Sequence, residues 1–467
     1  MTITPDVLDA LRDALPTAEV CTDPALIAEL SADSSPRSKK ATTAARPLAT
    51  ADLVVRVSST EDVVATVRWA RENGIPVLAR GGGSGVVGSG LPIRGGVVID
   101  MSGLNHVGEV NVTDRLVTVG AGLLGSDLEE ALQPHGLATG HYPQSFHLAS
   151  VGGWVTMRGS GTFSSLYGNI EDRVADLEVV LPTGEVLRTK SIPRASQGPD
   201  LKQLFIGSEG TLGIITSVTL RLVPLPEDRR FNSLHFTSFD GALDTAREML
   251  RSGVRPAVLR IYDPIESTAK HARFAEGDGW LMILAFDGNP ELTSAQEQIT
   301  LEIAGAHGAT ILGEQPGIAW EQRRFDWSWF TDNVEKTGGI AEAIEISASW
   351  SELAALYTTV TTAAASAMDQ VMGHVSHIYD QGASLYVISS GHFDDDEAAL
   401  QAYDKLWDAV MTATISAGAQ ISHHHGIGLE RSRWMTDAVG DVAMSTLKRV
   451  KNALDPAAIM NPGKLGI

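Results

Sequence analysis

Residues 80–90 read Arg-Gly-Gly-Gly-Ser-Gly-Val-Val-Gly-Ser-Gly, and five of the eight residues from 81 to 88 are glycine. Glycine lets the backbone approach another group closely and adopt positive φ angles. Consecutive backbone N–H groups in such a stretch can point into one concavity and bind an anion. The density of glycines therefore indicates a loop whose backbone is a binding surface; the alternative is a flexible hairpin without function.

This glycine loop contains the pattern GxGxxG at Gly83, Gly85 and Gly88. In a Rossmann fold that pattern follows a strand and opens a helix. Residues 76–79 are strand-like, but residues 89–96 read Ser-Gly-Leu-Pro-Ile-Arg-Gly-Gly and cannot start a helix. The Gly-Lys-Ser/Thr ending of a Walker A loop is also missing. We predict a loop between strands at 76–79 and 97–100 that holds a pyrophosphate in a fold other than Rossmann.

Two further elements rich in small residues lie downstream. The second runs from Pro143-Gln144-Ser145 through Ser150-Val151-Gly152-Gly153-Trp154 to Arg158-Gly159-Ser160-Gly161, and we expect another loop of the same kind. The third contains Glu209-Gly210-Thr211-Leu212-Gly213-Ile214-Ile215 and places a turn just before a strand. The first two elements together indicate an extended cofactor, and the third could meet its base or ribose.

The length of 467 residues predicts two domains, because single hydrophobic cores stop growing at about 250–300 residues. Short strand patterns separated by glycine turns predict an α+β first half. After Pro-Leu-Pro-Glu at 224–227 the helical patterns become longer. Residues 31–47 are polar and are expected to form an irregular arm or loop. We predict a helical arm over 1–45, a first domain over 46–226, a second over 227–416 and a C-terminal segment over 417–467.

Composition limits the possible partners. The chain has 36 Lys and Arg against 57 Asp and Glu, a net charge of −21, which disfavours nucleic acid and anionic membranes as partners. The single cysteine, Cys21, excludes an intrachain disulfide framework and a cysteine-based zinc site, and it fits a reducing compartment. We see neither a signal peptide nor an apolar stretch of membrane-spanning length. We therefore expect a cytoplasmic protein without an integral membrane span.

Residues 422–428 read Ser-His-His-His-Gly-Ile-Gly. If this stretch is extended, its pleat places His423 and His425 on one face and His424 on the other. An imidazole with a pKa near neutrality can take a proton from a hydroxyl group.

The three glycine elements, the motif Tyr167-Gly168-Asn169-Ile170-Glu171-Asp172 and the triple histidine resemble the FAD-linked oxidases of the vanillyl-alcohol oxidase and p-cresol methylhydroxylase superfamily. Within it, Val151-Gly152-Gly153-Trp154, Arg158 and the triple histidine are most similar to the alkyldihydroxyacetonephosphate synthase branch. The resemblance covers roughly residues 50–467. It implies an α+β fold: a two-part FAD-binding domain of the p-cresol methylhydroxylase type, an α/β cap domain over the substrate, and a C-terminal segment that returns to the flavin.

The resemblance also implies which residues contact FAD. The first element would bind the pyrophosphate, the second the ribityl chain and flavin ring, and the third the adenosine side. Relatives with covalent FAD carry a histidine where this chain has Ser84, or a cysteine in the second element, so we expect non-covalent FAD. The candidate FAD-binding residues are Arg80, Gly81, Gly82, Gly83, Ser84, Gly85, Pro143, Gln144, Ser145, Ser150, Val151, Gly152, Gly153, Trp154, Arg158, Ser160, Gly161, Glu209, Gly210, Thr211, Gly213, Ile214, Ile215 and Asn461.

By the same resemblance, the triple histidine lies on the substrate side of the flavin. Either His424 or His425 would be the acid/base, and His423 accompanies them. Tyr379 and Tyr386 are candidates for a hydrogen bond to the substrate, although packing on a strand explains Tyr386 equally well.

Hydroxy-acid dehydrogenases of the superfamily hold a divalent ion with a histidine motif and a Glu-His pair. Here residues 377–386 contain His377 alone, and the Glu-His position reads His424-His425. Because this ligand set is incomplete, we predict no metal site.

The chain departs from the synthase pattern where an arginine would hold a phosphate, since that position is Thr331. Arg323 or Arg324 could substitute for it. The aromatic residues Trp320, Phe325, Trp327, Trp329 and Phe330 suggest either core packing or a pocket for a bulky or apolar substrate.

We predict an FAD-dependent oxidoreductase that oxidises a small-molecule alcohol or 2-hydroxy acid by hydride transfer and passes electrons to an acceptor. The alternative is a synthase-like transferase without net redox chemistry. The resemblance favours a homodimer.

Overall fold

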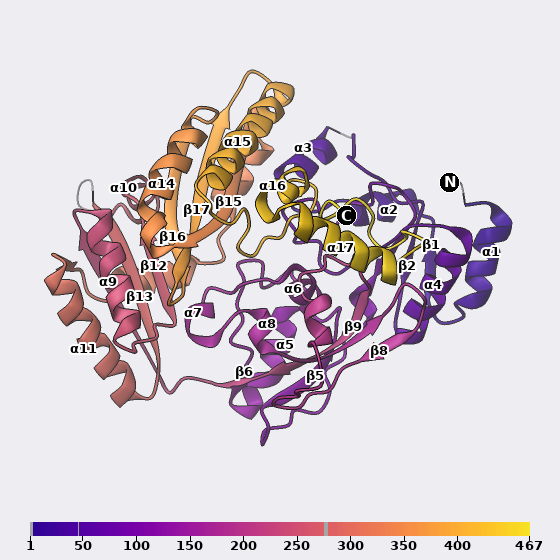
Figure 1. The fold of residues 1–467 in the computed structure, drawn as a ribbon, viewed down its shortest axis with the longest axis horizontal. Coiled ribbons are helices and arrows are strands. Elements are labelled where there is room, and N and C mark those ends of the chain that lie inside the picture. The colour runs from indigo at the N-terminus through magenta and orange to yellow at the C-terminus, as the bar shows by residue number, and fades with distance from the viewer. Residues whose placement is uncertain (1–2, 45, 275–278) are drawn as a thin grey trace.

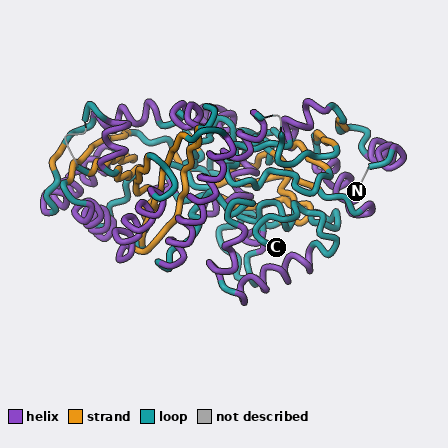
Figure 2. Tube along the Cα trace, turned by 90° about the horizontal axis from the view of Figure 1, so that it is seen from above, coloured by secondary structure: helices purple, strands orange, loops and turns teal. Residues whose placement is uncertain are grey.

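The computed structural model describes residues 3–44, 46–274 and 279–467. Figure 1 shows two lobes, an N-terminal one built on small sheets and a second one built on a large sheet, with the C-terminal segment lying against the first. The view in Figure 2 shows the same elongated, two-lobed outline. Among the described residues, none of the helices combines the length and apolarity needed to cross a bilayer.

The N-terminal arm consists of α1 (Pro5–Ala14), β1 (Glu19–Cys21), α2 (Pro24–Leu30) and α3 (Pro36–Thr43). The expectation of an irregular stretch over 31–47 was wrong, because α3 lies within it. Ser35 caps this helix by accepting a hydrogen bond from the N–H of Ser38, and Pro36 occupies the first turn, where no N–H is needed. Polar side chains of α3 are buried against other parts of the chain, which composition alone does not indicate.

The first small sheet has the order β1-β2-β4-β3, with β2 (Leu53–Arg56), β3 (Val77–Arg80) and β4 (Val97–Asp100). Helix α4 (Thr60–Asn73) follows β2, begins at a capping box of Ser59 and Asp62, and ends at Gly74 in the left-handed region. Strand β4 is parallel to both β2 and β3. Residues 81–96 therefore cross between parallel neighbours without a helix, which excludes both a hairpin and a Rossmann unit.

The second small sheet is antiparallel, with the order β5-β9-β7-β8. Its strands are β5 (Leu116–Gly120), β7 (Val174–Val180), β8 (Val186–Arg188) and β9 (Ile214–Arg221). Around it lie α5 (Gly125–Leu132), α6 (Val151–Met157), α7 (Ser164–Tyr167), α8 (Ile170–Arg173), β6 (Leu137–Ala138) and β10 (Val223–Pro224). Apolar residues of both small sheets, such as Val55 and Val218, belong to one buried core.

The second lobe is a seven-stranded antiparallel sheet of order β14-β11-β13-β12-β16-β17-β15. Its strands are β11 (Asp228–Phe236), β12 (Val258–Tyr262), β13 (Trp280–Gly288), β14 (Thr310–Ile311), β15 (Gly339–Ser349), β16 (Gln370–Ile378) and β17 (Gly382–His392). The helices α9 (Phe239–Arg251), α11 (Pro290–Ala306), α14 (Trp350–Ala365) and α15 (Asp396–Ser416) pack on one face around a second core.

The other face of this sheet turns toward the first lobe, where Tyr262 and Ile283 pack with Phe163. The remaining helices of the lobe are α10 (Pro264–His271), α12 (Gln315–Arg323) and α13 (Ser328–Glu335). Strand β10 pairs with β6, whereas β11 already belongs to the seven-stranded sheet. The predicted domain limits themselves stay predictions.

The C-terminal segment carries α16 (Met435–Val439) and α17 (Asp441–Leu454) and returns to the first lobe (Figure 1). Met460 forms a parallel bridge with Val77 at the start of β3. The buried ammonium group of Lys451 donates to the carbonyl oxygen of Thr211, at 2.8 Å, and to Asp455. This segment therefore contacts the chain next to the first and third glycine elements.

Candidate functional site

The glycine loop leaves its backbone donors free. Within the described parts of the chain, none of the N–H groups from Gly81 to Val87 donates a hydrogen bond to a protein acceptor. Gly83 has a φ of +67°. A Cβ atom on Gly82 would lie 1.6 Å from the carbonyl oxygen of Leu148, so the loop touches the second element with no room for a side chain. A half-buried row of free N–H groups fits a pyrophosphate.

The second element is a helix start, and the expectation of a loop over its middle part was wrong. Residues 151–157 form α6, because Ser150 accepts a hydrogen bond from the N–H of Gly153 and caps the helix. Pro143, Gln144 and Ser145 lie in the turn before it. Arg158, Ser160 and Gly161 follow it, and Arg158 has a φ of +54°.

The third element meets the C-terminal segment just before β9. The buried carboxylate of Glu209 accepts hydrogen bonds from the N–H groups of Ile427, at 2.7 Å, and Gly428, at 2.9 Å. The side-chain amide of Asn461 donates to the carbonyl oxygens of Glu209, at 2.6 Å, and Ser89, at 3.1 Å. Gly210 to Ile215 continue from this contact into β9. The structure thus brings the first and third elements and Asn461 together, while their contact with FAD stays a prediction.

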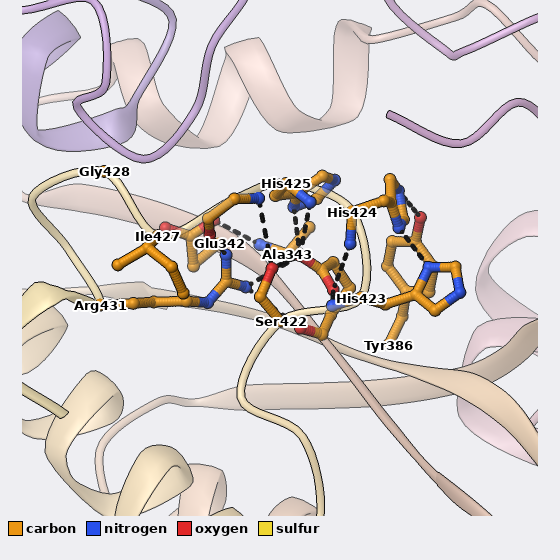
Figure 3. A network of polar contacts seen from close by, with 12 residues as sticks. Glu342, Ala343, Tyr386, Ser422, His423, His424, His425, Ile427, Gly428 and Arg431 are labelled. Atoms are coloured by element: carbon orange, nitrogen blue, oxygen red, sulfur yellow. Dashed lines mark hydrogen bonds and ion pairs between the residues drawn. The ribbon is translucent and has the colours of Figure 1, made fainter. Parts of the chain in front are cut away.

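The triple histidine is bent, so the expectation of alternating faces was wrong. Figure 3 shows Ser422, His423, His424 and His425 in one network of polar contacts, and the four residues surround the carboxylate of Glu345 on β15. That carboxylate accepts hydrogen bonds from the N–H groups of His423, His424 and His425, the last at 2.8 Å, and from the hydroxyl group of Ser422, at 3.0 Å. A buried carboxylate needs such donors, and here they impose the backbone bend.

Sequence reasoning missed Glu345. Its signal was an acidic residue at a position of the long strand 339–349 where apolar residues surround it. Arg431, which is also fully buried, lies 3.2 Å from the Glu345 carboxylate. Burial raises the pKa of Glu345, but Arg431, the histidines and the N–H donors outweigh burial, and the pKa of Glu345 is lowered. We infer that this carboxylate is ionised and positions the histidines.

Two of the histidines and both predicted tyrosines form one hydrogen-bonded chain. The hydroxyl oxygen of Tyr379 lies 2.7 Å from Nε2 of His423. Nδ1 of His423 lies 2.8 Å from Nδ1 of His424, and Nε2 of His424 lies 2.8 Å from the hydroxyl oxygen of Tyr386. At the Tyr379 end, the side-chain amide of Asn169 donates to the tyrosine oxygen at 3.0 Å. We call this set, Tyr379, His423, His424 and Tyr386, the tyrosine–histidine chain.

The tyrosine–histidine chain has two arrangements of protons in which every member is neutral. Each neutral imidazole carries one N–H and one acceptor nitrogen. In one arrangement Tyr379 donates to His423, His423 to His424, and His424 to Tyr386. In the other every bond is reversed, and Tyr379 donates to Asn169. A switch from one to the other moves one proton along the whole chain without leaving a charge inside it.

Burial favours these neutral forms. It lowers the pKa of His423 and His424, and it raises the pKa of Tyr379 to about 12. Burial also lowers the pKa of His425 to about 4. His425 lies outside the tyrosine–histidine chain, with Nδ1 at 3.7 Å from Glu345. Of the two histidines proposed as acid/base, only His424 belongs to the tyrosine–histidine chain, and its role as acid/base stays a prediction.

Glu345, His423 and His424 could offer one ligand atom each to a metal, because these atoms lie within 4.8 Å of one another. However, the Glu345 carboxylate already accepts several hydrogen bonds from the bent loop. The two histidines use both ring nitrogens in the tyrosine–histidine chain. The donor set therefore does not fit a metal without breaking these contacts.

Two further sequence-based expectations concern residues near the tyrosine–histidine chain: the aromatic stretch over 320–330, and Arg323 or Arg324 as phosphate-binding residues. Trp329 packs with Tyr386 and Met372, so the aromatic stretch reaches the site. Arg323 donates to the backbone of Lys270, and Arg324 lies over the rings of Phe163 and Phe325 at 4.9 and 4.5 Å. His377 is buried and stacks on His423 with ring centroids 5.2 Å apart.

Two family models together match most of this chain. Residues 51–190 match the family model described as FAD binding domain, and residues 225–465 match FAD linked oxidases, C-terminal domain. An alkyldihydroxyacetonephosphate synthase of Caenorhabditis elegans is 29% identical, over 89% of this chain and 76% of its own. An uncharacterised FAD-linked oxidoreductase of Escherichia coli K12 is 32% identical, over 88% of each chain. A mitochondrial D-lactate dehydrogenase (cytochrome) of Arabidopsis thaliana is 30% identical, over 89% of this chain and 73% of its own.

Solved structures share the fold. A structure of alkyldihydroxyacetonephosphate synthase superposes with a TM-score of 0.82 at 24% identity, covering 99% of this chain and 85% of that one. A structure of p-cresol methylhydroxylase with substrate bound superposes with a TM-score of 0.78 at 16% identity, covering 99% and 96%. The predicted fold, with its FAD-binding part of the p-cresol methylhydroxylase type, is confirmed.

Proposed function

Because the chain belongs to the FAD-linked oxidases, we propose that it oxidises the CH–OH group of an alcohol or a 2-hydroxy acid with non-covalent FAD. The cofactor, when bound, supplies the acceptor for a hydride. The observation that carries the proposal is the tyrosine–histidine chain, because oxidation of a hydroxyl group must also remove its proton. The free N–H groups from Gly81 to Val87 would hold the pyrophosphate.

The different exposure of Tyr386 and Tyr379, the two ends of the tyrosine–histidine chain, suggests the direction of proton movement. Tyr386 is 7% exposed and packs beside Trp329, whereas Tyr379 is half-buried and precedes the exposed Asp380 and Gln381. The substrate hydroxyl would give its proton to the oxygen of Tyr386 while Tyr386 passes its own proton to His424. His424 then donates to His423, His423 to Tyr379, and Tyr379 releases a proton toward solvent. After these transfers the tyrosine–histidine chain is in the second of its two neutral proton arrangements.

An anaerobic absorbance experiment tests this function. We expect 2-hydroxy acids or apolar alcohols to bleach the flavin band of the purified protein. His424→Ala interrupts the chain, so bleaching should slow by about 100-fold or more, the usual contribution of acid/base catalysis. His392→Ala is a matched control on the exposed end of β17. Equal rates for His424→Ala and the wild type would contradict the proposed role of the chain.

A transferase without net redox chemistry is the second candidate. Its support is the similarity to alkyldihydroxyacetonephosphate synthase over 89% of the chain. Thr331 weakens it, because threonine cannot replace a phosphate-binding arginine. This candidate would be favoured if none of the 2-hydroxy acids and apolar alcohols bleached the flavin band while the protein exchanged an acyl group for an alkoxy group on a substrate. We also propose, as expectations from sequence, a cytoplasmic location and a homodimer.

A further inference from the structure

His377 is the extra residue of a bulge in β16. The pairing with β17 shifts its register between Ser376 and Ile378, so β16 has one more residue here than its partner strand. His377 has a φ of +29°, and it is the one described non-glycine residue with a positive φ inside a strand. Backbone strain of this kind persists only where the surrounding structure holds it, and it is concentrated at functional sites.

The bulge moves the side chain of His377 from one face of the large sheet to the other. In a regular strand His377 would share a face with Val375, because side chains two positions apart point the same way. Val375 belongs to the second core, and so does Ile378, which takes the position that His377 would otherwise have. The N–H of Ile378 donates to the hydroxyl oxygen of Ser165 on α7 at 3.2 Å, so the first lobe holds the bulge in place.

The ring of His377 lies against the tyrosine–histidine chain. It stacks on the ring of His423 with an interplanar angle of 14° and meets the ring of His424 edge-on, with centroids 4.9 Å apart. Its centroid lies 6.5 Å from that of the Tyr386 ring. Because the hydroxyl oxygen of Tyr386 contacts His424, His377 lies next to the part of the chain that would receive the substrate proton.

His377 has a polar atom that the protein itself does not satisfy. The residue is 4% exposed, and its Nδ1 has no hydrogen-bond partner among the described residues. An unpaired buried polar atom is costly. Burial lowers the pKa of His377 well below its usual value, and His424 and His423 lower it further, so the ring is neutral and carries one N–H. A strained and buried imidazole with an unpaired nitrogen is expected to bind a ligand.

We propose that His377 donates a hydrogen bond to the substrate oxygen that loses its proton to Tyr386. This inference rests on the proposed function and adds a substrate-binding residue to it. Negative charge develops on the substrate oxygen as its proton leaves, and a donor that is already in place stabilises that charge. No proton leaves His377, because the proton of the substrate moves along the tyrosine–histidine chain.

Binding of p-nitrophenol to the FAD-loaded protein tests this assignment without turnover. Its oxygen-bearing carbon has no hydrogen to transfer, and its anion has a visible absorbance band of its own. We expect the wild type to bind the anion, and His377→Phe, which keeps an aromatic ring, to bind it about 10- to 100-fold more weakly. The neutral phenol, titrated at lower pH, should distinguish the two proteins much less, because a hydrogen bond to a charged oxygen is the stronger one.

Two further variants and thermal unfolding separate a binding role from a structural one. His377→Gln keeps an N–H donor and should recover part of the lost affinity. His392→Phe is the same substitution at the exposed end of β17 and should bind like the wild type. Because Nδ1 is unpaired in the empty protein, His377→Phe should melt at or above the wild-type temperature. A lower melting temperature together with equal losses of anion and neutral-phenol binding would overturn the inference.

The two proposals can fail separately. If binding of the anion depends on His377 but no hydroxy compound bleaches the flavin, the oxygen-binding site stands and the oxidation fails. If a hydroxy compound bleaches the flavin of His377→Phe as fast as that of the wild type, the oxidation stands and the role of His377 fails. Equal affinity of the wild type and His377→Phe for the anion, or no binding by either, would also overturn the role of His377.

Discussion

Two buried glutamates of β15 differ in the cation and the hydrogen-bond donors beside them, and their pKa values shift in opposite directions. Glu345 faces the site and accepts several N–H groups beside Arg431, and its pKa is lowered. Glu342 lies on the opposite face, where it accepts from the hydroxyl group of Tyr403 at 2.6 Å and from the N–H of Ala343. Burial therefore dominates there and raises the pKa of Glu342 to about 7. The same residue type has a positioning role on one face and a pH-sensitive one on the other.

Glu342 should make the stability of the second lobe depend on pH. Its pKa in the folded state is about 7, above the unfolded value of 4.5, so its contribution is fully present below pH 4.5 and is lost as the pH rises through 7. Relative to Glu342→Gln, the wild-type free energy of unfolding should fall by up to about 1.4 kcal/mol per pH unit in this window. Urea unfolding at several pH values measures this. A difference between the wild type and Glu342→Gln that stays constant with pH would refute the prediction, and Glu352→Gln on the exposed side of α14 is the matched control.

At the scale of helices and strands, the sequence predicted those elements whose limits are set by nearby residues. The Ser59 cap and Gly74 fixed the limits of α4, and the four residues 97–100 were predicted as the strand that is observed. Helix α3 and the bend at 422–425 were missed because distant partners stabilise them. Lys40 of α3 bonds to Asp396, and Glu345 bends the histidine loop. The tyrosines and histidines were predicted as candidates, but not their order in one chain, since that order depends on tertiary contacts.

The glycine loop at residues 80–90 contacts the second glycine-rich element at Leu148, and this contact predicts which glycines FAD binding requires. Gly82→Ala would place its Cβ 1.6 Å from the Leu148 carbonyl oxygen, so the two elements must move apart. Overpacking of this kind costs about 1–3 kcal/mol, and we expect FAD affinity to fall at least about tenfold. Gly90→Ala is the control, because its Cβ would meet Asp33 at an ordinary 3.7 Å. Titration of the apoprotein with FAD measures both variants, and equal affinities would refute the packing argument.

At the scale of the whole molecule, α3 of the N-terminal arm joins the two lobes and the C-terminal segment. Lys40 donates to Asp396 at the start of α15, at 2.7 Å, and to the carbonyl oxygen of Lys336. Arg37 pairs with Glu430 of the C-terminal segment at 2.9 Å and with Asp404 of α15. Figure 1 shows α3 next to α16, on the side of the first lobe that faces the second lobe. The position of the large sheet over the first lobe thus depends on a segment that precedes both.

Removing this connection should destabilise the molecule more than removing a surface ion pair. The side chain of Lys40 is 3% exposed, and Lys40→Met leaves the carbonyl oxygen of Lys336 without this donor and Asp396 with the N–H of Gly338 but no cation. We expect the free energy of unfolding to fall by about 2 kcal/mol. Arg12→Met breaks an exposed pair with Asp9 on α1 of the same arm and should cost less than about 1 kcal/mol. Urea unfolding measures both. Losses of equal size would show that α3 covers the lobes without holding them together, because the buried contacts of Lys40 would then contribute no more than a solvated pair.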